Sequence, residues 1–360
     1  MIHPRRFIVV AALTVSAAAC ATDPTEGPGT PPEGVLRPTL AIAANPRPIP
    51  APQAADFVAA LDSSLAVGAK GIVQTYTWRE LEPDSARLDV QRVIDDFRYS
   101  RSRGLQIFLG IQVINTVKRE MPADIAALAW TDPRVQRRFD RLLDALQPIL
   151  GDVTYFSIGN EVADYLRTRS EWPAYTTFVG QAVASLHRRV PGIKVGATME
   201  YSGAAINTTA ARALIAVSDV AIYTLYPFLL DSFNVAPATI TGVLFDNMIV
   251  IAGGKPVVLQ ELGYPASSVN RSSELAQAAF FTDAIGQWRA RGSTAMPFVS
   301  LFLLHDFTPQ QCSDFGVYYN LPNQPQFIEF LCSLGLRKAD GSPRPSWDAV
   351  RTATTWLRTP

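Results

Sequence analysis

The sequence predicts a single-domain α/β protein of the (β/α)8, or TIM, barrel class. Of its 360 residues, 48 % are hydrophobic and 18 % are charged, so a large core is available. Short apolar segments alternate with longer amphipathic ones between residues 38 and 358, as strands and helices do in such barrels. A doubly wound nucleotide-binding fold would carry a glycine-rich turn after its first strand, and neither GxGxxG nor GxxxxGK occurs there.

Eight segments have the composition expected of parallel strands that are covered on both faces. Each segment is short and apolar or nearly so, with turn residues nearby. The segments are 39–43, 71–76, 105–111, 154–158, 194–198, 219–224, 256–260 and 296–303. Eight strands of this kind, alternating with helices, match one closed barrel better than an open sheet.

Amphipathic segments between the strands predict the helices of the outer layer. They cover residues 53–65, 90–103, 133–150, 172–189, 210–217 and 274–291. Several of these segments begin next to Pro or Asp, and two end at Gly104 and Gly292, which are common signals at helix termini.

The N-terminus predicts export from the cell. A basic start precedes an apolar run over residues 7–15, and small residues follow up to Cys20, as in a secretory signal peptide. The run is too short for a membrane-spanning helix, which needs ~20 apolar residues. The small residues before Cys20 resemble a bacterial lipobox, so we expect residues 1–20 to be a signal peptide and Cys20 to be lipidated; simple cleavage and secretion is the alternative. Residues 21–37, rich in Pro and Gly, would tether the barrel of residues 38–358 to a periplasmic or cell-surface membrane.

The charge balance indicates which partners to expect. With 32 basic and 32 acidic residues the net charge is zero, which gives no electrostatic basis for binding a nucleic acid or an anionic membrane surface. We therefore expect a neutral ligand such as a carbohydrate and a monomeric protein whose only membrane contact is the lipid anchor.

The cysteines and histidines argue against a metal site. Cys312 and Cys332 are the only cysteines besides Cys20, and in an exported protein they predict a disulfide rather than a zinc site. The chain has three histidines and contains neither HExxH nor GxSxG, which argues against metalloprotease and serine-hydrolase functions. No cofactor is expected.

Polar residues follow the predicted strands, where a barrel carries its active site. Asn160 and Glu161 follow the fourth strand and Glu261 follows the seventh, and the two glutamates are 100 residues apart. That spacing corresponds to three βα units of a barrel, so the two carboxyl groups would face each other across its mouth. A separation of ~5 Å would suit cleavage of a glycosidic bond with retention of configuration.

These motifs resemble the clan A glycoside hydrolases. SIGNE ends the fourth strand, SDVAIYTLYPF covers the sixth and KPVVLQELGYP the seventh, while WRELEP follows the second. The pairing of YPF with ExxYP is most similar to the arabinogalactan endo-β-1,4-galactanase family, and the resemblance spans residues 40–304. It implies a retaining TIM-barrel glycosidase.

The resemblance also implies roles for individual residues. Glu161 would be the general acid/base and Glu261 the nucleophile. Asn160 would hydrogen-bond the 2-hydroxyl of the sugar under attack, and Tyr226 or Tyr223 would lie beside Glu261.

Further residues at the strand ends are candidates for substrate binding. They are Trp78 and Arg79 after the second strand, Glu200 after the fifth and His305 after the eighth. The alternatives are packing at the rim for Trp78 and Arg79, and contact with a neighbouring side chain for Glu200. In many clan members the eighth strand ends in Trp. Here the sequence at that point is LFLLHDF, so Phe302, His305 or Phe307 would take the place of this Trp.

The sequence thus predicts a retaining glycoside hydrolase acting on a β-linked poly- or oligosaccharide. Like-charge repulsion between the glutamates would keep Glu161 protonated while Glu261 stays charged. Two alternatives remain open. One is a non-catalytic carbohydrate-binding lipoprotein on the same scaffold, and the other is a transglycosidase, in which a sugar replaces water in the second step.

Overall fold

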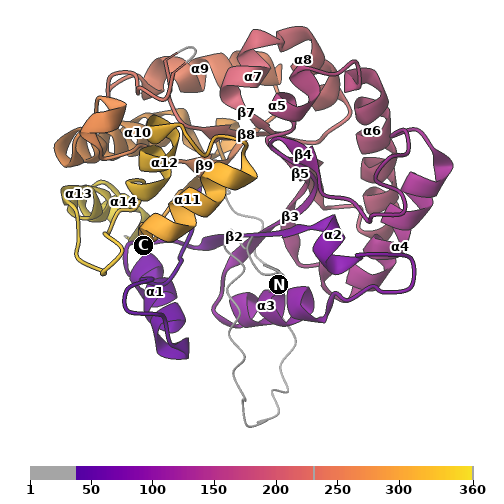
Figure 1. Ribbon diagram of the computed structural model, residues 1–360, viewed down its shortest axis with the longest axis horizontal. Helices are drawn as coiled ribbons and strands as arrows, with labels where there is room; N and C mark the ends of the chain where they lie inside the picture. The colour runs from indigo at the N-terminus through magenta and orange to yellow at the C-terminus, as the bar shows by residue number, and fades with distance from the viewer. Residues whose placement is uncertain (1–37, 230–231, 359–360) are drawn as a thin grey trace.

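The computed structural model describes residues 38–229 and 232–358. The predicted signal peptide, Cys20 and the tether lie outside the described residues. Within them, parallel strands form a nearly closed barrel that is surrounded by helices (Figure 1). The predicted fold class is therefore confirmed.

The strands occupy eight positions around the barrel. Their bounds are β1 Thr39–Ile42, β2 Gly71–Thr77, β3 Gln106–Asn115, β5 Val153–Asn160, β6 Lys194–Gly196, β7 Thr198–Glu200, β8 Ala221–Leu225, β9 Val257–Leu262 and β10 Phe298–Leu301. Only Ala197 separates β6 from β7; β6 pairs with β5 and β7 pairs with β8, so the two share one position. A short strand, β4 (Lys118–Arg119), pairs antiparallel with β3. All eight predicted strands are present.

The six predicted helices are also present, as the outer layer of the barrel. They are α1 Ala54–Ala66, α3 Gln91–Ser102, α4 Pro133–Leu150, α6 Trp172–Arg189, α8 Thr208–Ala216 and α10 Glu274–Ala295. At Gly292, where the sequence predicts the end of α10, the backbone has a φ of 73° and the helix is kinked. The sequence analysis missed α9 (Thr241–Ala252), because the exposed Val243 and Val250 obscure its amphipathic pattern.

Several further helices lie at the strand ends and after β10. They are α2 Trp78–Leu81, α5 Val162–Arg167, α7 Tyr201–Ile206, α11 Pro309–Tyr318, α12 Pro325–Cys332, α13 Pro345–Ala353 and α14 Thr355–Arg358, with a 3-10 turn at Ser268–Asn270. No helix within residues 38–229 and 232–358 is long and apolar enough to cross a membrane.

The interior of the barrel changes from apolar to polar along the strands. Near the strand starts, Phe108, Tyr155 and Phe298 pack together in a fully or largely buried cluster. Further along the strands, the inward positions hold Ser157 on β5 and Gln260 on β9. Both side chains are hydrogen-bonded to Thr198, at 2.7 and 2.6 Å respectively. Because side chains alternate in direction along a strand, the next inward-facing side chains lie at the carboxyl ends of the strands, where the barrel opens.

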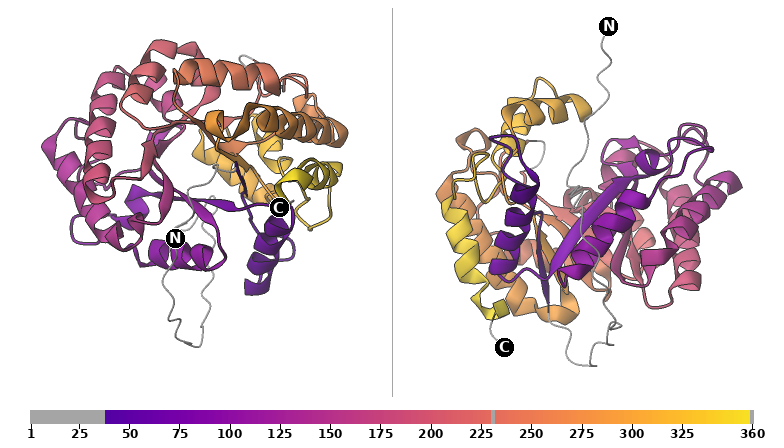
Figure 2. Two further views of the ribbon diagram at one scale, coloured as in Figure 1. Left: turned by 180° about the vertical axis from the view of Figure 1, so that it is seen from behind. Right: turned by 90° about the horizontal axis from the view of Figure 1, so that it is seen from below.

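After β10 the chain leaves the barrel and returns, forming the α11–α12 segment (residues 307–334). In the right-hand view of Figure 2, the yellow-orange part of this segment projects beyond one end of the barrel. The predicted disulfide between Cys312 and Cys332 joins α11 to the end of α12.

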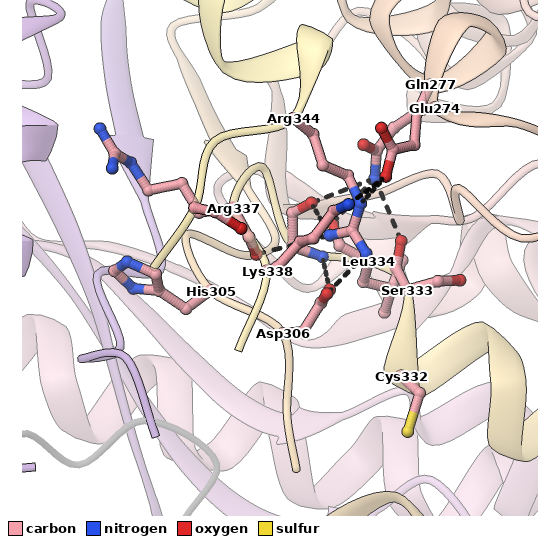
Figure 3. A network of polar contacts seen from close by, with 12 residues as sticks. Glu274, Gln277, His305, Asp306, Cys332, Ser333, Leu334, Arg337, Lys338 and Arg344 are labelled. Carbon is pink, nitrogen blue, oxygen red and sulfur yellow. Dashed lines mark hydrogen bonds and ion pairs between the residues drawn. The ribbon is translucent and has the colours of Figure 1, made fainter. Parts of the chain in front are cut away.

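Polar contacts hold the base of the α11–α12 segment to the barrel (Figure 3). Asp306 forms a buried ion pair of 2.6 Å with Arg344 and accepts a hydrogen bond of 2.7 Å from the Gly335 backbone. Gln277 of α10 donates to the backbone of Ser333. The two ends of the segment are therefore fixed on the frame of the barrel.

Candidate active site

A cavity of about 450 Å³ lies at the carboxyl ends of the strands, and both predicted glutamates line it. Asn160, Glu200 and Tyr226 line it as well. The structure therefore brings together five of the residues that the sequence predicts for the site. They come from the ends of β5, β7, β8 and β9, as expected for a barrel active site.

A sharp turn after β5 sets the position of Glu161. Gly159 has a φ of 92°, and a Cβ at this position would come within 2.6 Å of Val162 and of the Tyr175 hydroxyl; only glycine fits. Glu161 itself adopts the left-handed conformation with a φ of 48°, and α5 begins at the next residue. Non-glycine residues in this conformation are costly and cluster at functional sites.

Two threonine hydroxyls hold the Glu161 carboxyl group. Thr116 donates to Oε2 at 2.7 Å and Thr224 donates to Oε1 at 2.8 Å. Thr116 also has a positive φ, of 47°. Two left-handed residues in direct hydrogen-bond contact indicate a backbone that is held in shape for its side chains.

The carboxyl group of Glu261 accepts hydrogen bonds from two other side chains. The Tyr226 hydroxyl donates to Oε2 at 2.5 Å, and Gln260 Nε2 approaches Oε1 at 3.3 Å. The ring of Tyr226 packs edge-on against Phe302 and Phe330, with centroids 6.2 and 5.0 Å apart. This packing fixes the direction of the phenol.

A chain of side-chain amides runs from Glu261 to helix α11. Gln260 Nε2 also donates to Asn160 Oδ1 at 2.7 Å, and Asn160 Nδ2 donates to Asn115 Oδ1 at 3.1 Å. Asn115 in turn donates to the Tyr318 hydroxyl of α11 at 3.0 Å. Asn160 keeps one free amide hydrogen in this arrangement, so it can still donate to a ligand.

Burial raises the pKa of both glutamates. For Glu161 burial is the largest cause, opposed by the hydrogen bonds from Thr116 and Thr224. Burial and then the charge of Glu161 raise the pKa of Glu261, opposed by the hydrogen bonds from Tyr226 and Gln260. The sequence analysis expected repulsion to act mainly on Glu161; burial is the larger effect, and it acts on both. Both shifts favour the protonated form of a carboxyl group near neutral pH.

Glu200 is a third carboxyl group in the cavity. Both of its oxygens are buried and have no hydrogen-bond partner among the described residues. Burial, and then the charges of Asp164 and Glu161, raise the pKa of Glu200 well above its ordinary value. An unpaired buried carboxyl group is costly in its charged form, so this environment favours the protonated form of Glu200, which can donate a hydrogen bond.

Two of the predicted substrate-binding residues lie beside the second strand and not in the cavity. Trp78 is fully buried, donates to Glu82 at 2.9 Å and packs against Phe139 of α4. The side chain of Arg79 is half-exposed, and its Nε lies 3.5 Å from Glu120. Neither residue lines the cavity, so the structure does not support a contact of Trp78 or Arg79 with a substrate there. The alternative role, packing at the rim of the barrel, agrees better with their contacts.

Tyr223 and His305 also lie away from the cavity. Tyr223 is fully buried, and its hydroxyl has no hydrogen-bond partner among the described residues. The Nδ1 of His305 lies 2.7 Å from the backbone oxygen of Asn45, at the base of the α11–α12 segment (Figure 3). Phe302 and Phe307, the other two candidates for the place of the missing Trp, both line the cavity.

Several residues of the site were not predicted from the sequence. Asn115 and Thr116 come from the end of β3, and Gln260 directly precedes Glu261. Tyr319 lies at the end of α11, and burial, followed by the charges of Glu161 and Glu261, raises the pKa of its phenol. Polar residues at the end of β3 were a usable signal; nothing in the sequence places Tyr319 there.

The donor set does not suit a metal ion. Within residues 38–229 and 232–358, no group of three or more His, Cys, Asp or Glu side chains is arranged to hold one. The groups that can act on a ligand in this site are therefore carboxyl, amide, hydroxyl and aromatic groups.

Comparison of the sequence with protein-family models and with curated proteins finds no match. Solved structures do match. A GH5_18 protein from Streptomyces cattleya in complex with GlcNAc is similar with a TM-score of 0.68 and 17 % identity, covering 91 % of this chain and 82 % of that one.

Two other glycosidase structures resemble the chain. The exo-β-1,4-mannosidase Op5Man5 from Opitutaceae bacterium strain TAV5 has a TM-score of 0.66 at 13 % identity, over 93 % of this chain and 62 % of that one. The GH53 catalytic domain from Ignisphaera aggregans has a TM-score of 0.57 at 16 % identity, over 80 % of this chain and 86 % of that one. At such identities the likeness establishes a shared TIM-barrel fold.

Proposed function

We propose that this protein is a retaining glycoside hydrolase in which Glu261 is the nucleophile and Glu161 the general acid/base. The observation that carries the proposal is the pair of buried carboxyl groups in one cavity, each held by neutral hydrogen-bond donors. The glycosidases that share the fold support it, and among them the S. cattleya protein binds GlcNAc.

The hydrogen bonds favour this division of roles. The phenol of Tyr226 donates to Glu261 and stabilises its charged form, which a nucleophile needs. The pKa of Tyr226 is raised well above its ordinary value by burial and by the charge of Glu261, so the phenol remains a neutral donor. This division of roles requires Glu161 to be protonated and Glu261 to be charged when a substrate is bound.

The reaction follows in two steps. Glu261 attacks the anomeric carbon while Glu161 transfers its proton to the leaving oxygen, and the C–O bond to the aglycone breaks. Glu161, now a carboxylate, takes a proton from water as that water attacks the anomeric carbon and releases Glu261. In this proposal Asn160 donates its remaining amide hydrogen to one hydroxyl of the sugar, and Glu200 in its protonated form donates to a second hydroxyl.

We further propose that the sugar is β-linked and that the substrate is a poly- or oligosaccharide or a simpler glycoside. The galactanase-like motifs in YPF and ExxYP support a β-linkage by resemblance. Export and lipidation at Cys20 likewise stay predictions from the N-terminal sequence.

Aryl β-glycosides of several sugars provide the test. We expect turnover of at least one, and a loss of kcat/KM on the order of 10³-fold or more in Glu261→Gln. With Glu161→Ala, azide should restore cleavage of an activated aryl glycoside and give the β-glycosyl azide. The matched control is Asp348→Asn on α13, whose side chain is 69 % exposed. Formation of the α-azide, or full activity in Glu261→Gln, contradicts the proposal.

A further inference from the structure

One tyrosine fixes the end of helix α11 beside β3 and β4. The hydroxyl of Tyr318 donates to Glu120 Oε1 at 2.9 Å and accepts a hydrogen bond of 3.0 Å from Asn115 Nδ2. The ammonium group of Lys118 lies 3.6 Å from the centre of the Tyr318 ring, a cation–π contact. Neither Tyr318 nor Glu120 lines the cavity, so any effect of these two residues on a ligand passes through Asn115.

The carboxyl group of Glu120 sets the direction of these hydrogen bonds. Glu120 lies 3.5 Å from both Arg79 and Lys118, and a carboxylate only accepts hydrogen bonds. Burial and then the charge of Glu120 raise the pKa of Tyr318, so the phenol keeps its hydrogen. Because that single hydrogen goes to Glu120, the phenol oxygen can only accept from Asn115.

This direction is passed on to Asn160. A side-chain amide donates from nitrogen and accepts at oxygen, so Asn115 with Nδ2 towards Tyr318 has Oδ1 free to accept. Asn160 Nδ2 donates to that oxygen at 3.1 Å, and Asn160 Oδ1 accepts from Gln260 Nε2 at 2.7 Å. All three amides are buried, and Asn160 lines the cavity.

The other end of the amide chain requires the same direction. Thr198 donates to Gln260 Oε1 at 2.6 Å, and Gln260 Nε2 lies 3.3 Å from the carboxyl group of Glu261. If Asn160 alone turned over, two oxygens would meet at Asn115 and two N–H groups would meet at Gln260. Asn160 can therefore turn only if Asn115 also turns, which the hydrogen bond to Tyr318 opposes.

We propose that Tyr318 is a positioning residue, which holds the amide of Asn160, through Asn115, in the orientation that keeps one hydrogen for a hydroxyl of the sugar. This inference rests on the proposed glycosidase function. It makes sugar binding depend on helix α11, which follows the barrel strands in the chain.

Aryl glycosides that lack one hydroxyl at a time test the inference. The parent is the glycoside that the wild type cleaves, and its monodeoxy forms are compared with it. Asn160→Ala identifies the hydroxyl in question, because kcat/KM should fall least on the form that lacks it. Tyr318→Phe should then lower kcat/KM on the parent about two- to ten-fold, as expected for one neutral hydrogen bond, and leave kcat/KM on that deoxy form near the wild-type value.

Variants of Glu120 and a second tyrosine provide the controls. Glu120→Gln keeps an acceptor oxygen for Tyr318 and should keep the wild-type ratio of kcat/KM between the parent and the deoxy form, whereas Glu120→Ala should behave like Tyr318→Phe. Tyr264→Phe is the matched control, because its hydroxyl donates to the backbone oxygen of Ala236 at 2.8 Å and does not line the cavity; its ratio should not change. Activity on the deoxy form shows that a variant is folded.

The outcomes separate this inference from the proposed function. Equal losses on the parent and the deoxy form in Tyr318→Phe, or no loss on either, overturn the inference, as does an Asn160→Ala variant that singles out no hydroxyl. If the wild type cleaves no glycoside, the proposed function fails and this inference fails with it. If the wild type is active and the ratio in Tyr318→Phe is unchanged, only this inference fails.

Discussion

Replacing Tyr226 by Phe separates the hydrogen bond to Glu261 from the packing of the ring. The substitution removes one hydroxyl that donates to Glu261 at 2.5 Å, and the ring contacts with Phe302 and Phe330 remain. A hydrogen bond to a charged group contributes about 1.5–3 kcal/mol. Since 1.36 kcal/mol corresponds to one pH unit, the pKa of Glu261 should rise by about one to two pH units in the variant.

The direction of the change in the pH profile follows from the charge that the nucleophile needs. Glu261 attacks as a carboxylate, and the hydrogen bond from Tyr226 lowers its pKa. Without that bond, Glu261 stays protonated to higher pH. The acidic limb of the kcat/KM profile should therefore move up by about one to two pH units, and kcat/KM on this limb should fall about 10- to 100-fold.

The assay is the pH dependence of kcat/KM on an activated aryl glycoside, with Tyr223→Phe as the matched control. Tyr223 lies on β8, three residues before Tyr226, but its buried hydroxyl has no hydrogen-bond partner within the described residues and Tyr223 does not line the cavity. The control should keep the wild-type profile. An unchanged acidic limb in Tyr226→Phe would refute the assigned role of this hydrogen bond.

Three further variants test other parts of the structure. Glu200→Gln removes a carboxyl group whose pKa is raised in the folded state. Because of that raised pKa, the free energy of unfolding of the wild type should decrease as pH rises above the ordinary glutamate pKa. Thermal melts should show that the melting temperature of the variant decreases less over the same pH range. The same variant should raise KM more than it lowers kcat if Glu200 binds substrate. Glu82→Ala breaks the buried contacts to Trp78, Arg138 and Arg141, so urea unfolding should show a loss of about 3 kcal/mol; an unchanged midpoint would contradict the buried network. Replacing Cys312 and Cys332 by Ser removes a cross-link between residues 20 apart and should cost up to about 3 kcal/mol, with faster proteolysis of the α11–α12 segment; equal digestion rates would contradict its stabilising role.

The parts of the site that were predictable are those set by the strand ends. Apolar runs locate the strands, and in a barrel their carboxyl ends share one rim, which brought Glu161 and Glu261 into one cavity. Side chains along β8 alternate between the inside and the outside of the barrel. Thr224 points inward and contacts Glu161, so its neighbour Tyr223 faces the outer helices. Both Tyr223 and Tyr226 were candidates for the position beside Glu261, because the prediction from the sequence did not use that alternation.

The candidate residues that lie outside the cavity are those whose direction depends on distant partners. Trp78 turns into the core because Glu82 accepts its indole N–H and is itself bound by Arg138, 56 residues later. His305 turns towards Asn45, which is 260 residues earlier in the chain. Phe307, Phe315, Phe327 and Phe330 line the cavity because the α11–α12 segment returns to the barrel, and no local sequence pattern predicts that path.

The most direct test of the two-glutamate mechanism is to trap the covalent intermediate. A 2-deoxy-2-fluoro glycoside with an activated leaving group should slow release of the intermediate, and mass spectrometry should find the fluorosugar on the peptide that contains Glu261. Labelling of the Glu200 peptide instead, or an α-configured product from an ordinary β-glycoside, would contradict the account.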